Sequence, residues 1–181
     1  MTETNKSPAT AQPNTTGSPG DVPLERPSQL AALDALLGEW DVQASFAAGF
    51  LGPDSQATTV GGARTSFEWL AGQHFMIQRF TVENPTVPSG IAIIGAGDRP
   101  ATLTQHYYDS RGVARVYQMS LADGAWKLWR DAPGFCQRFT GVLSDDETRI
   151  DGAWQTSADG LDWMHDFDLT YFRIAPAAAD R

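Results

Sequence analysis

The sequence predicts an all-β fold, a closed antiparallel up-and-down barrel of about ten strands with a short N-terminal helix. Segments of alternating polarity fill most of the chain after position 38, compact turns rich in Asp and Gly separate them, and helical periodicity is confined to one short stretch. So many hairpin-linked strands in one sheet must curl, and closure removes the exposed edges that invite aggregation. A β-sandwich is the alternative, but short connections favour neighbours that run up and down.

Composition limits the function classes. The chain has 181 residues, 41% of them hydrophobic, which suits one domain. Its formal net charge of -9 opposes binding to nucleic acid or to an anionic membrane surface. Cys136 is the only cysteine, and we find neither an apolar run of the kind seen in export signals near the start nor a stretch long enough for a membrane span. The expected location is therefore cytoplasmic.

Three regions are expected along the chain. Residues 1–27 are mainly Thr, Ser, Pro, Asn, Gly and Ala, and are predicted to be a disordered tail because they offer little apolar surface to bury. Residues 28–175 form the predicted barrel domain, and 176–181 a short C-terminal tail. At the start of the domain, Ser28 is expected to cap a short helix that Gly38 ends. Its apolar face would be Leu30, Leu33, Leu36 and Leu37.

Strands are expected from Trp40 almost to the end of the domain. In the first, Trp40, Val42, Ala44 and Phe46 alternate with polar residues, which is typical of a strand with one buried face. Tight turns that tolerate positive φ separate the later strands. These are predicted at about 63–70, 74–82, 90–96, 102–109, 113–121, 125–130, 135–143, 149–156 and 161–174.

The two ends of the predicted barrel resemble a known family. Gly38-Glu39-Trp40 opens the first strand, and the last contains Leu169-Thr170-Tyr171-Phe172-Arg173. This resembles the lipocalins and their calycin relatives, which carry Gly-X-Trp on the first strand and an Arg on the last. The resemblance implies that Arg173 lies across the indole of Trp40 and closes the barrel base. The helix followed by Leu36-Leu37-Gly38-Glu39-Trp40 is also similar to nitrobindin-type haem barrels and to uncharacterised bacterial lipocalin-like domains.

The last strand suggests an inward histidine. Trp163, Phe167, Leu169 and Tyr171 share one parity, and His165 shares it with them. His165 is therefore predicted to face the lumen, either as a core histidine bonded to a backbone carbonyl or as a haem ligand or acid/base group.

Arginines within strands are unusual in so acidic a chain. They either face inward, where a guanidinium can bind a carboxylate or phosphate, or lie outside in solvent. Around His106 and Arg115 the mixture of aromatic and polar residues leaves the inward face undecided. The candidate ligand-binding residues are Arg79, His106, Tyr108, Arg115, Tyr117, Arg138 and His165.

No cofactor follows from the residues themselves. His74, His106 and His165 lie on three different predicted strands without metal-site spacing, so no metal site is predicted. The resemblance to nitrobindin-type barrels implies haem, held through His165, as an alternative.

The expected function is binding of a small apolar or amphipathic molecule in the barrel lumen. One alternative is a barrel enzyme, an isomerase, a cyclase or a haem-dependent enzyme, that uses lumen His, Tyr and Arg side chains. Another is an interaction module with a solid barrel. The sequence leaves open whether the chain forms a homo-oligomer.

Overall fold

The computed structural model describes residues 25–85, 87–99 and 102–175 of the chain. A 3-10 helix, η1 (Ser28–Leu36), precedes ten strands. The strands are β1 (Gly38–Phe46), β2 (Thr58–Trp69), β3 (Phe75–Val82), β4 (Gly90–Ala96), β5 (Leu103–Asp109), β6 (Ala114–Ala122), β7 (Ala125–Arg130), β8 (Cys136–Leu143), β9 (Arg149–Ser157) and β10 (Met164–Arg173).

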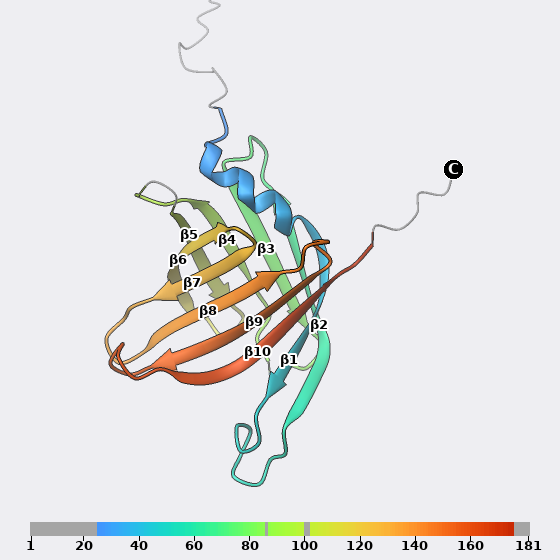
Figure 1. Ribbon diagram of the computed structural model, residues 1–181, viewed down its shortest axis with the longest axis vertical. Helices are drawn as coiled ribbons and strands as arrows, with labels where there is room; N and C mark the ends of the chain where they lie inside the picture. The colour runs from blue at the N-terminus through green and yellow to red at the C-terminus, as the bar shows by residue number, and fades with distance from the viewer. Residues whose placement is uncertain (1–24, 86, 100–101, 176–181) are drawn as a thin grey trace, which may run out of the picture.

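The strands form one closed antiparallel barrel (Figure 1). Each pairs with its neighbour in sequence, and β1 pairs with β10 to close the ring, with Trp40 opposite Arg173. The expected all-β up-and-down barrel with a short N-terminal helix is confirmed. β2 begins at Thr58, earlier than expected, because its first residues pair with β1 beyond a register shift between Val42 and Ala44.

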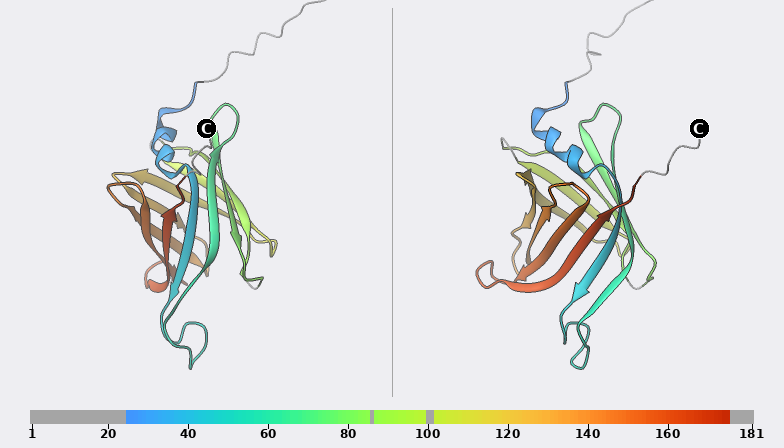
Figure 2. Two further views of the ribbon diagram at one scale, coloured as in Figure 1. Left: turned by 90° about the vertical axis from the view of Figure 1, so that its right-hand side faces the viewer. Right: turned by 45° about the vertical axis from the view of Figure 1, so that its right-hand side comes forward.

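Helix η1 lies across one end of the barrel, which we call the upper end (Figures 1 and 2). A 3-10 helix has three residues per turn, so Leu30, Leu33 and Leu36 fall on one side. All three are fully buried and join the barrel core. The expected cap at Ser28 is wrong: Ser28 is the first helical residue, Pro27 precedes it, and no side chain caps the helix.

A group of packed aromatic side chains lies inside the barrel. The ring of Trp126 packs against Phe67, Phe139 and Tyr171, with centroids 5.1 to 5.9 Å apart. Phe139 lies flat along the inner wall over Gly152, where an added Cβ would meet the ring at 2.3 Å. Glycine at that position therefore makes room for the ring.

The described chain begins before the helix. Of the expected tail, only 25–27 are described; the other residues of 1–27, and the expected C-terminal tail 176–181, lie outside the described residues. The guanidinium carbon of Arg26 lies 4.3 Å from the ring centroid of Trp69, and its Nη2 is 2.9 Å from Asp34 Oδ2. In the described part of the chain, no helix is long and apolar enough to cross a membrane.

Candidate ligand-binding site

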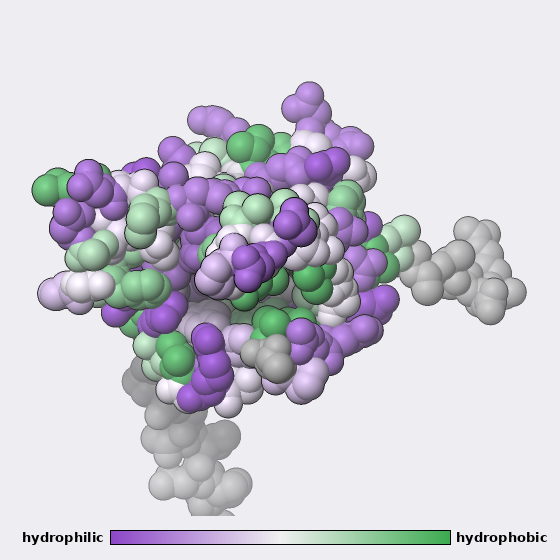
Figure 3. Space-filling view, turned by 90° about the horizontal axis from the view of Figure 1, so that it is seen from below, coloured by the Kyte–Doolittle hydropathy of each residue, from purple (hydrophilic) through white to green (hydrophobic). Residues whose placement is uncertain are grey.

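The end of the barrel opposite η1 is its lower end. β1 ends there at Phe46, β5 at Asp109 and β7 at Arg130, and the one helix among the described residues lies at the other end. Seen from below, a hollow opens between hydrophobic and hydrophilic side chains (Figure 3).

Buried polar side chains line part of the lumen. Gln105 is paired with Ile94 on one neighbour strand and with Tyr117 on the other, and facing partners in a sheet point to the same side. By the same rule Gln78 lies inside, where its Nε2 donates to Thr65 Oγ1 over 3.2 Å. The buried inward polar residues are Thr65, Gln78, Gln105 and Gln137.

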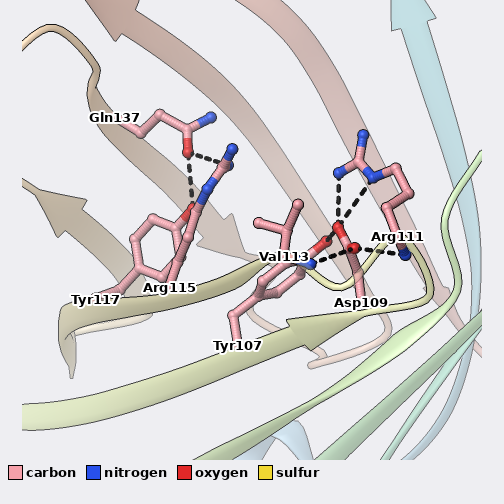
Figure 4. A network of polar contacts seen from close by, with 7 residues as sticks. All are labelled: Tyr107, Asp109, Arg111, Val113, Arg115, Tyr117 and Gln137. Carbon is pink, nitrogen blue, oxygen red and sulfur yellow. Dashed lines mark hydrogen bonds and ion pairs between the residues drawn. The ribbon is translucent and has the colours of Figure 1, made fainter.

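Arg115, Tyr117 and Gln137 form one cluster near the lower end (Figure 4). Gln137 Oε1 accepts from Arg115 Nη1 over 2.8 Å and from the Tyr117 hydroxyl over 2.7 Å. The Arg115 guanidinium also lies over the ring of Phe135, 4.9 Å from its centroid. Burial raises the pKa of Tyr117, although the positive charges of Arg115 and Arg130 oppose that shift. Tyr117 is therefore a neutral hydroxyl at physiological pH.

A second polar group pins the turn between β5 and β6 (Figure 4). The carboxylate of Asp109 accepts from Arg111 Nη2 over 2.6 Å and from the Tyr107 hydroxyl over 2.9 Å. It also accepts from the backbone amides of Arg111 and Val113. Arg111 above all holds the pKa of Asp109 well below its usual range, while burial and the Asp109 carboxylate raise that of Tyr107. The Asp109 carboxylate thus finds its counter-charge and its hydrogen-bond donors within this group.

Two buried atoms of inward-facing side chains have no hydrogen-bond partner in the described part of the structure. They are Gln105 Oε1 and Trp126 Nε1, and both residues are at most 4% exposed. A buried polar atom without a partner costs about 1 to 3 kcal/mol. Native structures pair almost all such groups, so each calls for an explanation.

Two of the seven candidate residues, Arg115 and Tyr117, face the lumen. Arg79 lies outside, with its Nε 3.1 Å from Glu68 Oε1. His106 and Tyr108 also lie outside: they have the opposite parity to buried Gln105, and both are exposed.

Arg138 and His165 lie on the outer face of β8 to β10. Arg138 donates through Nε to Gln155 Oε1 over 2.7 Å, and its guanidinium stacks 4.1 Å from the ring centroid of Trp163. His165 is opposite the same Gln155, and its Nε2 is 3.5 Å from Asp168 Oδ1. The predicted inward orientation of His165 is wrong.

A bulge explains that error. The register of β10 against β9 shifts between His165 and Phe167, so Asp166 is an extra residue on β10. One extra residue reverses the side on which all preceding side chains point. Phe167 therefore faces the lumen beside Trp154, while His165, two positions away, faces solvent.

Comparison with known proteins supports the fold. No protein-family model matches the chain, and no curated protein matches its sequence. The solved structure "Crystal Structure of Rv2717c from M. tuberculosis" matches with a TM-score of 0.56 and 14% identity, over 83% of this chain and 99% of that one. At this identity the likeness shows the fold alone.

The lumen residues do not fit haem. A histidine ligand for haem on the last strand would have to be His165, which the bulge turns outward. His106 is exposed on the outer face, and His74 lies in the turn before β3, so within 25–85, 87–99 and 102–175 no histidine enters the lumen. The same ranges contain no group of three or more His, Cys, Asp or Glu that could hold a metal ion.

Sequence reasoning missed several lumen residues, namely Thr65, Gln78, Gln105, Tyr107 and Gln137. A signal for some of them existed. Gln105 stands between Leu103 and Tyr107 at a spacing of two, and Gln137 stands two before Phe139. An amide that shares parity with apolar residues on a strand is a candidate buried polar group.

Proposed function

We propose that this protein binds a small apolar or amphipathic molecule in its lumen, through the lower end. The observation that carries the proposal is the pair of unpartnered buried atoms, the acceptor Gln105 Oε1 and the donor Trp126 Nε1. A ligand with its own donor and acceptor would remove the cost of burying them.

The wall chemistry supports the same proposal. Tyr107 stacks on Phe80 with ring centroids 5.5 Å apart, and Tyr117 meets Trp154 edge-on at 5.8 Å. Aromatic walls with a few polar groups are typical of sites that bury an apolar ligand and orient its polar end.

The test uses N-phenyl-1-naphthylamine, a neutral apolar fluorophore that brightens when it leaves water. Thr156 is register-paired with the inward Gln137, so Thr156→Phe fills part of the lumen. Thr140 lies on the outer face of β8 and is exposed, so Thr140→Phe adds the same ring outside. The full chain should enhance the fluorescence, Thr156→Phe should reduce the affinity, and Thr140→Phe should leave it unchanged.

Two outcomes would contradict the proposal. One is no enhancement with the full chain, and the other is equal loss of affinity in both variants.

A further inference from the structure

The pairing between β6 and β7 stops before the lower end of the barrel, which leaves a gap in the ladder there. β6 begins at Ala114, but its register with β7 starts only at Gln118, so its first four residues pair with β5 alone. A hollow of about 360 Å³ lies at this gap. It is lined by Tyr108, Ala114, Arg115, Val116, Arg130 and Asp131.

Two arginines line this hollow without a carboxylate partner. Among the described residues neither Arg115 nor Arg130 forms an ion pair; Arg115 bonds Gln137 and Tyr117, and Arg130 Nη1 donates to the carbonyl of Phe135 over 3.0 Å. Both residues line the same hollow. On the outer face, three strand arginines have acidic partners, Arg64 with Asp41, Arg79 with Glu68, and Arg149 with Asp151, whereas Arg138 bonds Gln155 and stacks on Trp163.

The neighbouring amide adds a further donor. Gln137 Oε1 already accepts two hydrogen bonds, which turns its Nε2 away from Arg115 and Tyr117 (Figure 4). In the described part of the chain that Nε2 donates to no residue. The gap thus presents an excess of donors, although the protein as a whole carries a net charge of -9.

We propose that the gap between β6 and β7 holds the carboxylate of a monoanionic ligand, whose apolar part extends into the lumen. Arg115 and Arg130 each bring one positive charge and Asp131 brings one negative charge, so one positive charge is left to balance a carboxylate. A phosphate dianion would leave the hollow negative. Guanidinium groups bind carboxylates through charge-assisted, often paired hydrogen bonds. This assignment rests on the proposed lumen binding and names its ligand class.

The test compares three probes with the same eight-carbon chain: octanoate, octan-1-ol and octyl phosphate. Affinities for the full-length protein are measured by ligand-observed NMR titration. Octanoate should bind at least about tenfold more tightly than octan-1-ol, and Arg115→Gln and Arg130→Gln should each remove most of that difference. Octan-1-ol should bind each variant within about twofold of the wild type, which also reports correct folding. Arg138→Gln, on the outer face, is the matched control and should leave octanoate binding unchanged.

The outcomes distinguish a failure of the carboxylate site from a failure of the proposed lumen binding. Binding of octan-1-ol without a preference for octanoate overturns the carboxylate site and leaves lumen binding standing. Tighter binding of octyl phosphate than of octanoate also overturns it, as does an equal loss in Arg138→Gln. If no probe binds and N-phenyl-1-naphthylamine does not bind either, the proposed function fails and the carboxylate site with it.

Discussion

Arg173 lies over the indole of Trp40, with its guanidinium carbon 4.1 Å from the ring centroid. The two residues are register partners across the seam between β1 and β10 that closes the barrel. The same guanidinium donates to the carbonyls of Ala35 and Leu37, at the end of η1, and Trp40 Nε1 donates to Leu36 O over 2.9 Å. One pair of side chains therefore joins the barrel seam to the helix that closes the upper end.

Replacing Arg173 should destabilise the fold strongly. Arg173→Met loses a cation–π contact and leaves helix-end carbonyls without donors, which should lower the free energy of unfolding by about 2 to 4 kcal/mol. Urea unfolding followed by tryptophan fluorescence measures it. Arg149→Met is the control: Arg149 also lies over a ring, that of Phe172, but is half exposed, so its loss should cost under about 1 kcal/mol. Equal losses would contradict the role of Arg173.

The strands could be predicted because their signals are local. Alternation from Trp40 onward and the turns at Asp123-Gly124 and Asp159-Gly160 lie in the sequence itself. The bulge at Asp166 could not be predicted, because Asp166 looks like any outward polar residue and only pairing with β9 shows it to be extra. That single residue reversed the orientation of His165.

Gly152 should not tolerate even a methyl group. In Gly152→Ala the new Cβ would lie 2.3 Å from Phe139 Cζ, so the ring must move and unfolding should become easier by about 1 to 3 kcal/mol. Gly61→Ala is the control, because no atom lies within 4 Å of a Cβ there and the effect should be within about 0.5 kcal/mol. Thermal unfolding of both variants checks this, and a wild-type melting temperature for Gly152→Ala would show that Phe139 does not occupy this wall.

The orientation of the strand arginines also depends on distant partners. Arg115 shares the parity of Tyr117, whereas Arg138 has the opposite parity to its neighbour Phe139. Arg115 faces inward because its opposite residue on β5 is Tyr107, and it meets Gln137 from β8. Such contacts join residues far apart in sequence, which is why the candidates included both inward and outward residues.

Gln105 should lower the free energy of unfolding of the protein when no ligand is bound. Because its Oε1 is buried without a described partner, Gln105→Leu should raise the free energy of unfolding by about 1 kcal/mol and weaken binding of N-phenyl-1-naphthylamine, whose N–H can donate to that oxygen. Gln78→Leu is the matched control: it removes the bond to Thr65 and should destabilise by about 0.5 to 1.5 kcal/mol. A loss of stability in Gln105→Leu would show that Oε1 is already satisfied.

Acid should weaken the turn between β5 and β6. Arg111 lowers the pKa of Asp109 in the folded state, whereas the unfolded carboxyl titrates near its ordinary value of about 4. Because the pKa is lower in the folded state, the Asp109 carboxylate stabilises the fold at any pH above the pKa of the unfolded state. That contribution is lost as the pH falls through the folded-state pKa. When the pH is lowered below about 4, the urea concentration at the unfolding midpoint of the wild type should therefore decrease. The midpoint of Asp109→Asn should already be lower at neutral pH and should decrease less on acidification.

Asp146 should leave some acid dependence in that variant. Hydrogen bonds from Ser144 and Thr148 lower the pKa of Asp146 to about 2. Parallel curves for the wild type and Asp109→Asn over this range would contradict the linkage, because an amide at position 109 cannot take up the proton.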